Sequence, residues 1–236
     1  MNSLHQPTMT KLLLQHYSEA ALRNADDLIA EATLLRDHDH MARAYFLAVA
    51  CIEEAGKALL AFDSQNRDLS DPAVCTKLKR SMENHGDKIN YALTRWAISD
   101  PSRRDAVKTA ADIIGHIKRG REPSMYSDLR TAPDRVQTPR EVVRDVVARD
   151  CVDLAQGCLR YARRHVIENI PATFTKTQDR LFTMKLAKLD QFLKKEDFYF
   201  FYLSRMEAGQ MDIAEAVFKY EQDHMMTGIP FQATKD

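Results

Sequence analysis

Residues 44–62 read AYFLAVACIEEAGKALLAF, which is the most apolar segment of the chain and the best indicator of its fold class. Every residue in it is apolar or small except Glu53, Glu54 and Lys57. A helix that is apolar on all sides is buried on most of its faces, so the stretch predicts a central helix over about residues 41–64. The three charged side chains argue against a membrane span at this position.

The charged trio inside this helix has two interpretations. Lys57 follows Glu53 by four residues and Glu54 by three, so it can form an intrahelical ion pair that fixes the helix register. Alternatively, a buried carboxylate orients a site residue on the neighbouring helix. Because burying an unpaired charge costs several kcal/mol, we expect Glu54 and Lys57 to be largely buried, with at least one bonded to the third helical region near His85.

The composition points in the same direction as this stretch. Only 7 Gly and 8 Pro occur in 236 residues, which favours an all-α fold, since all-β chains need more turn residues. Four cysteines occur without CxxC spacing, and we expect Cys51, Cys151 and Cys158 to be buried, reduced thiols. The spacing of Cys and His residues indicates no metal site, and no cofactor is expected.

Helical periodicity extends outward from the central stretch in both directions. Apolar residues at steps of three and four predict an amphipathic helix of about 25 residues before it. The further predicted helices span about residues 70–96, with an interruption at Gly86, and then 99–118, 138–170, 176–195, 197–207 and 211–224. Residues 119–138 have no clear periodicity and are predicted to form a loop, and no strand is predicted anywhere.

The charges are unevenly distributed although the formal net charge is zero. Residues 76–168 carry 19 basic and 13 acidic side chains, which indicates a polyanion partner for the middle of the chain. The alternative is an ordinary solvated surface with interspersed charges. The N-terminus has no apolar segment typical of a secretory signal, so we expect a cytoplasmic protein that is not bound to a membrane.

Arg80 and His85 form an Arg-x4-His pattern with the chemistry of RNA cleavage. His can act as a general base near neutral pH, and Arg can bind a phosphate with its planar guanidinium group. On one ideal helix, positions five apart differ by about 140°, so the two side chains converge only if the helix ends near Gly86 or a second subunit completes the site. The pattern is not specific by itself, because Arg160 and His165 match it as well.

Three segments together carry a resemblance to a known family. They are Ile52-Glu-Glu-Ala-Gly-Lys57, His85-Gly-Asp-Lys88-Ile89 and Arg121-Glu-Pro-Ser-Met-Tyr126-Ser-Asp128. Asn24-Ala25 with Leu28, and Ala42-Arg43-Ala44, precede them in the same order and spacing. Over residues 18–130 the chain resembles the AbiV family of abortive-infection proteins, which is grouped with the HEPN proteins.

This resemblance implies a fold, a partner and an activity. The expected fold is an all-α, HEPN-type up-and-down helical bundle over residues 1–170, with additional C-terminal helices in residues 171–236 packed on it. The expected assembly is a homodimer. The implied activity is a metal-independent endoribonuclease in antiviral defence, with Arg80 and His85 facing each other across the two-fold axis. Ser81 departs from the family pattern, which commonly has Asn, Asp or His at that position.

Six further residues are predicted to support this site, and two other functions stay open. The supporting residues are Glu53, Glu54, Lys57, Lys88, Tyr126 and Asp128. We expect the loop carrying Tyr126 and Asp128 to fold over the groove containing His85, the alternative being a surface loop without a role. The open functions are a non-catalytic toxin that blocks the translation machinery and a purely structural helical dimer. A phage-encoded trigger or an antitoxin is a further candidate partner.

Overall fold

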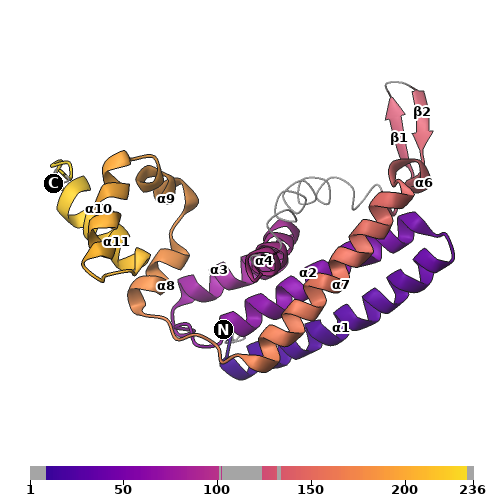
Figure 1. Ribbon diagram of the computed structural model, residues 1–236, viewed down its shortest axis with the longest axis horizontal. Helices are drawn as coiled ribbons and strands as arrows, with labels where there is room; N and C mark the ends of the chain where they lie inside the picture. The colour runs from indigo at the N-terminus through magenta and orange to yellow at the C-terminus, as the bar shows by residue number, and fades with distance from the viewer. Residues whose placement is uncertain (1–8, 101, 103–123, 132–133, 233–236) are drawn as a thin grey trace, which may run out of the picture. The chain divides into compact units, whose positions relative to one another are not determined.

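A computed structural model describes residues 9–100, 102, 124–131 and 134–232, and it confirms the all-α fold class (Figure 1). In the first part of the chain the helices are α1 (Lys11–Asp37), α2 (Met41–Asp63), α3 (Pro72–Glu83), α4 (His85–Ile98), α6 (Pro139–Val142) and α7 (Asp145–Glu168). They are followed by α8 (Lys176–Thr183), α9 (Leu186–Leu193), α10 (Glu196–Glu207), α11 (Ile213–Tyr220) and the π-helical turn η2 (Glu221–Met225). The two strands described are β1 (Asp128–Thr131) and β2 (Asp134–Gln137).

The chain divides into two compact units that interleave in sequence. The first unit comprises Met1–Asn66 and Leu78–Ala172, and the second comprises Arg67–Lys77 and Thr173–Asp236. The boundary between Lys77 and Leu78 falls within α3. The packing of the C-terminal helices on the first domain, with a boundary at residue 170, stays a prediction.

Small residues bring α1 and α2 together as an antiparallel pair. Thr10 caps α1 by accepting a hydrogen bond from the backbone N–H of Leu13. The chain reverses at Asp39, whose φ of 59° lies in the left-handed region. Along the contact, Ala25 and Ala32 of α1 are fully buried, and the hydroxyl of Ser18 donates to the carbonyl oxygen of Ala58 at 2.8 Å.

The central position predicted for residues 41–64 is confirmed. α2 packs against α1, α4 and α7, which lie around it in the first unit (Figure 1). Buried apolar residues run along its length, among them Ala44, Val49, Ile52 and Leu59. The expected buried thiols Cys51, Cys151 and Cys158 lie in the same unit and are free cysteines. No helix within the described residues is long and apolar enough to span a membrane.

The break in the third helical region comes earlier than the sequence predicts. The sequence places the interruption at Gly86, but α3 ends at Glu83 and α4 begins at His85. Asn84 lies between them as the N-cap, and its side-chain oxygen accepts from the backbone N–H of Asp87 at 3.0 Å. Asn is among the strongest N-cap residues, so it determines the start of the second helix.

The prediction of one helix from residue 138 is wrong at its start. Thr138 and Glu141 do form the predicted capping pair, in which Glu141 accepts from the Thr138 backbone N–H at 2.7 Å. That pair opens only the short α6, after which Val143 adopts an extended backbone, is buried in the core, and α7 restarts at Asp145. Val143 and Arg144 both have extended backbone, and these two residues separate the helices.

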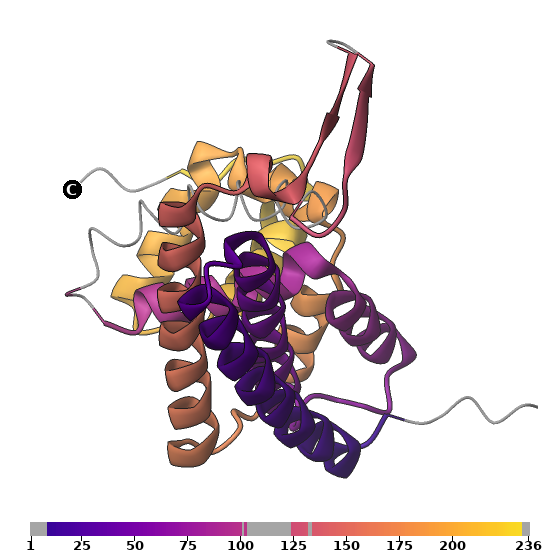
Figure 2. The ribbon, with the colours of Figure 1, turned by 90° about the vertical axis from the view of Figure 1, so that its right-hand side faces the viewer.

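The prediction that residues 119–138 contain no strand is also wrong. β1 and β2 pair in antiparallel register, with Leu129 opposite Val136, and the hairpin projects from the helices of the first unit (Figure 2). Each strand has four residues and only one of them is apolar, so no alternating hydrophobic pattern identifies it. The predicted helix over 99–118 lies mostly outside the described residues.

An aromatic core holds the second unit together. Phe192, Phe198 and Tyr220 are fully buried in it. The guanidinium group of Arg67 lies between the rings of Phe174 and Phe182, 3.9 and 4.0 Å from their centroids. Asp179 accepts a hydrogen bond from Arg67 at 2.6 Å, which ties the segment after α2 to α8. The predicted helix over 176–195 is two helices, α8 and α9, because Met184 and Lys185 have extended backbone.

Candidate active site

Gly56 lets the backbone of α4 approach the backbone of α2. A Cβ atom at position 56 would lie 2.1 Å from the carbonyl oxygen of Lys88, which is closer than any real contact. Only glycine therefore permits this helix crossing. The glycine of the Glu-Glu-Ala-Gly-Lys segment thus has a direct structural role, because it brings the first turns of α4 against the middle of α2.

At this crossing a buried carboxylate meets an exposed imidazole. Glu53 Oε2 lies 2.7 Å from Nδ1 of His85 and 3.3 Å from Nζ of Lys88. The side chains of Glu53 and Lys88 are 5% and 4% exposed, whereas that of His85 is 57% exposed. A buried ion pair of this kind compensates the desolvation of both charges only in good geometry. Both interpretations of the charged trio therefore have a counterpart in the structure: Glu53 is a buried carboxylate that contacts residues of the neighbouring helix, and Lys57 forms an intrahelical ion pair with Glu54.

The hydrogen bond defines which nitrogen of His85 can act as a base. An ionised carboxylate only accepts hydrogen bonds, so Nδ1 of the neutral imidazole carries the proton and Nε2 has the basic lone pair. Glu53 fixes the orientation of the ring and would stabilise the imidazolium ion formed on protonation. The same division of roles serves the carboxylate and histidine of general-base catalysts.

Glu54 and Lys57 form an ion pair with each other within α2. Their side chains are 14% and 22% exposed, so the expected burial is confirmed. The expected contact from one of them to the third helical region is wrong, because Glu53 makes that contact instead. Successive residues of a helix point about 100° apart, so Glu54 lies off the face on which Glu53 meets α4, and Lys57 pairs with Glu54.

Arg80 lies in the last turn of α3, on a different helix from His85. Its side chain is exposed, and it forms no hydrogen bond or ion pair with any residue that the structure describes. The predicted helix end that would allow the two to converge is present, at Glu83. Neighbouring Ser81 is buried.

The segment that carries Tyr126 and Asp128 lies partly against the start of α2. Arg43 of α2 donates a hydrogen bond to the sulfur of Met125 at 3.4 Å. Arg43 precedes Glu53 by ten residues, which is about 15 Å along a helix. Tyr126 is 67% exposed, and Asp128 opens the exposed start of β1. Their contribution to the His85 site stays a prediction.

A second polar cluster, which the sequence did not predict, joins the C-terminal ends of α2, α4 and α7. Asp63 accepts hydrogen bonds from the hydroxyl of Tyr91 at 2.6 Å, from Arg95, and from Nε2 of His165 at 2.9 Å. Burial raises the pKa of Asp63, but the hydrogen bonds from His165, Tyr91 and Arg95 outweigh it and lower the pKa below its ordinary value. The one feature of the sequence that pointed to a residue of this cluster is the Arg-x4-His pattern of Arg160 and His165.

The comparisons with known proteins concern the part of the chain that contains the contact between Glu53 and His85. The family model described as AbiV, of the HEPN type, matches residues 13–160, which is more than half of the chain. The chain belongs to the AbiV family. The matched region of this AbiV-family protein contains Glu53, Gly56, His85 and Lys88 and ends before His165. No match was found among curated proteins or among solved structures.

Family membership confirms the resemblance predicted from the sequence and makes this chain an abortive-infection protein of the HEPN type. Among the residues described, no group of three or more His, Cys, Asp or Glu side chains is arranged to hold a metal ion.

Proposed function

We propose that this AbiV-family protein is an antiviral endoribonuclease that uses His85 as a general base and requires no metal ion. The single observation that carries the proposal is the hydrogen bond between the buried Glu53 and the exposed His85. A carboxylate that is protected from solvent holds the ring in one tautomer, while the ring itself is accessible to a large substrate.

The proposed reaction is a transesterification within the RNA chain. Nε2 of His85 takes the proton of a ribose 2′-hydroxyl, and the oxygen attacks the adjacent phosphorus. The bond from phosphorus to the 5′-oxygen breaks, a 2′,3′-cyclic phosphate forms, and the leaving oxygen takes up a proton. Arg80 stabilises the charge that develops on the phosphate oxygens, for which its planar guanidinium is suited.

Lys88 and Glu53 are positioning residues in this proposal. Lys88 compensates the charge of the Glu53 carboxylate in a buried environment, which keeps Glu53 available as an acceptor for His85. Arg80 is exposed on a separate helix, which supports a composite site in a homodimer, with Arg80 of one protomer beside His85 of the other.

The test is cleavage of total RNA by the purified protein in the presence of EDTA. We expect the wild type to cleave and His85→Ala to lose at least about 10²–10⁴-fold of the rate, the usual contribution of general acid–base catalysis. Arg80→Lys should lose most of the activity, because an ammonium group does not reproduce the guanidinium geometry. His16→Ala and Arg23→Lys, at exposed positions of α1, are the matched controls.

Three outcomes would overturn the proposal. Cleavage that persists in His85→Ala, or that depends on a divalent metal, contradicts the mechanism. Toxicity in cells without any RNA cleavage would instead support a non-catalytic toxin that binds the translation machinery.

A further inference from the structure

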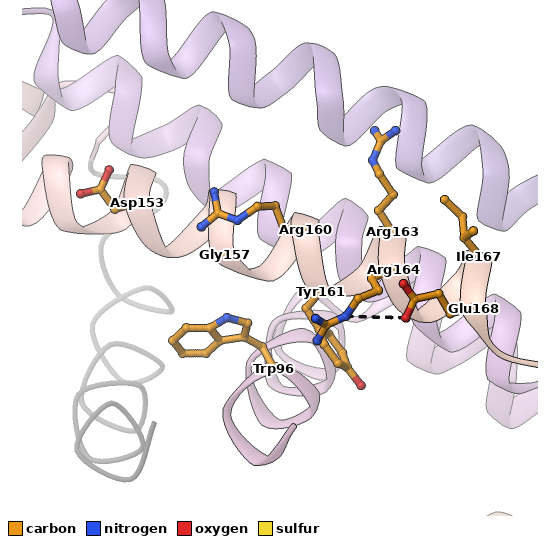
Figure 3. Close-up of a pocket in the computed structure, with 9 residues that line it drawn as sticks. All are labelled: Trp96, Asp153, Gly157, Arg160, Tyr161, Arg163, Arg164, Ile167 and Glu168. Carbon is orange, nitrogen blue, oxygen red and sulfur yellow. Dashed lines mark ion pairs between the residues drawn. The ribbon is translucent and has the colours of Figure 1, made fainter. Parts of the chain in front are cut away.

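A pocket of about 590 Å³ lies between α7 and the end of α4, all of it within the first unit (Figure 3). Its volume lies within the range of about 300–1,000 Å³ that is common for ligand sites. It is lined by Trp96, Asp153, Gly157, Arg160, Tyr161, Arg163, Arg164, Ile167 and Glu168. Three arginines and two aromatic residues thus share one pocket, separate from the contact between Glu53 and His85.

Gly157 gives Trp96 its place in this pocket. A Cβ atom at position 157 would lie 3.1 Å from the indole nitrogen, so the ring rests against the helix backbone where no side chain intervenes. Figure 3 shows the indole beside Gly157 and below Arg160, with Tyr161 next to it. Trp96 is only partly buried, so its ring contributes accessible aromatic surface to the pocket.

The charges on the pocket leave one arginine uncompensated. Arg163 pairs with Asp26, Arg164 lies 3.9 Å from Glu168, and Asp153 pairs with Arg36 at 3.3 Å. Arg160 is exposed and forms no ion pair with any residue in the described part of the chain. The pocket therefore has a net positive charge located beside the indole ring.

We infer that this pocket binds a nucleotide of a single-stranded RNA, with its base on Trp96 and its phosphate at Arg160. Proteins that bind single strands combine aromatic rings, on which bases stack, with cationic groups that follow the backbone. A neutral apolar ligand would offer no partner to the guanidinium group of Arg160. This inference rests on the proposed function, because the pocket would be the surface that holds the RNA while His85 acts on the RNA chain.

The two sites are connected by α4. His85 lies in its first turn and Trp96 in its last, eleven residues and about 16 Å apart along the helix. A single strand of several nucleotides spans that distance. One strand can therefore be held at the pocket while a neighbouring segment reaches His85.

The test uses the fluorescence of Trp96, which is the single tryptophan of the chain. The probe is a 2′-O-methyl RNA octanucleotide, which has no nucleophilic 2′-hydroxyl and cannot be cleaved by the proposed reaction. We expect saturable quenching of tryptophan emission, which weakens with added salt as phosphate contacts do. A 5′-fluorescein-labelled copy of the probe gives the affinity independently by anisotropy.

Variants on the two sides of the pocket separate the stacking and phosphate contacts. Arg160→Glu and Trp96→Leu should each weaken binding of the labelled probe by about tenfold, given the usual contribution of stacking and phosphate contacts. Arg149→Glu is the matched control, because Arg149 lies on the same helix outside the pocket and pairs with Asp39 at 3.7 Å. It should weaken binding far less than Arg160→Glu. Circular dichroism verifies that each variant is folded.

Three results would overturn the inference. They are binding by anisotropy without a change in Trp96 emission, equal effects of Arg160→Glu and Arg149→Glu, and binding of a mononucleotide as tight as that of the octamer. Binding of the uncleavable probe is measured separately from cleavage of total RNA. If the wild type binds the probe as expected but cleaves no RNA, the proposed function is contradicted and the inference about the pocket is not.

Discussion

Glu53 and His85 are joined by a contact of 2.7 Å between a carboxylate that is almost fully buried and an imidazole that is more than half exposed. The contact links α2 to the first residue of α4, and Lys88, one turn later on α4, reaches the same carboxylate oxygen. Buried charge on one side and solvent on the other is the arrangement that a positioned general base needs. It also makes the stability of the helix crossing depend on the same three residues.

We expect Glu53→Gln to lower the free energy of unfolding by about 3–5 kcal/mol, because it leaves the buried Lys88 ammonium without a counter-charge. Urea denaturation followed by circular dichroism measures this. The double variant Glu53→Gln/Lys88→Met should recover most of the loss, since no buried charge then remains. The exposed pair Lys79–Glu83 provides the control, and Glu83→Gln should cost less than about 1 kcal/mol. Equal losses in the two single variants would contradict this account.

Gly56→Ala should be costly for a different reason. The added Cβ meets the backbone of Lys88 rather than a flexible side chain, so the two helices must separate. Overpacking of this kind costs about 1–3 kcal/mol, and the separation also lengthens the contact between Glu53 and His85. We therefore expect Gly56→Ala to lower both the rate of RNA cleavage and the melting temperature.

Gly157→Ala is the matched comparison on α7. There the added Cβ meets only the side chain of Trp96, at 3.1 Å, and alanine gains about 1 kcal/mol of helix propensity over glycine. We expect a change in the melting temperature much smaller than that of Gly56→Ala. A similar loss in both variants would show that backbone proximity at Gly56 is not the decisive factor.

The sequence predicts the buried helix but not the orientation of its charges. Residues 44–62 are apolar on all sides, so the pattern indicates burial without indicating which side faces which neighbour. The choice between Glu53 and Glu54 depends on the rotation of α2 relative to α4. That rotation is fixed by the backbone contact at Gly56, which involves residues more than thirty positions apart.

The Asp63 cluster and the hairpin could not be predicted, for related reasons. The partners of Asp63 are Tyr91, Arg95 and His165, which only the packing of three helices brings together. In the hairpin, Leu129 and Val136 are the only apolar residues of their strands, and both are exposed. The helices, by contrast, are predictable because their apolar residues repeat at the helical period.

The lowered pKa of Asp63 predicts a specific loss of stability in acid. A carboxyl group whose pKa is lower in the folded state stabilises the fold fully above its unfolded pKa, near 3.9. That contribution is lost as the pH falls from about 5 through the folded pKa. We therefore expect Asp63→Asn to be less stable than the wild type at pH 7 and to show a flatter decline below about pH 5. Urea denaturation at a series of pH values measures this, with Asp27→Asn as the exposed control.

The composite site proposed for the dimer can be tested by mixing two inactive variants. If Arg80 of one protomer acts with His85 of its partner, a heterodimer of Arg80→Lys and His85→Ala contains one intact site and one doubly altered site. Random exchange at equal concentrations makes half of the dimers mixed, so about a quarter of the wild-type activity should return.

Light scattering should show a dimer, and subunit exchange should precede the recovery of cleavage. If the two residues act within one chain, every site in the mixture has one altered residue and activity stays at the level of the separate variants. A monomer at micromolar concentration that cleaves RNA would contradict the composite site directly.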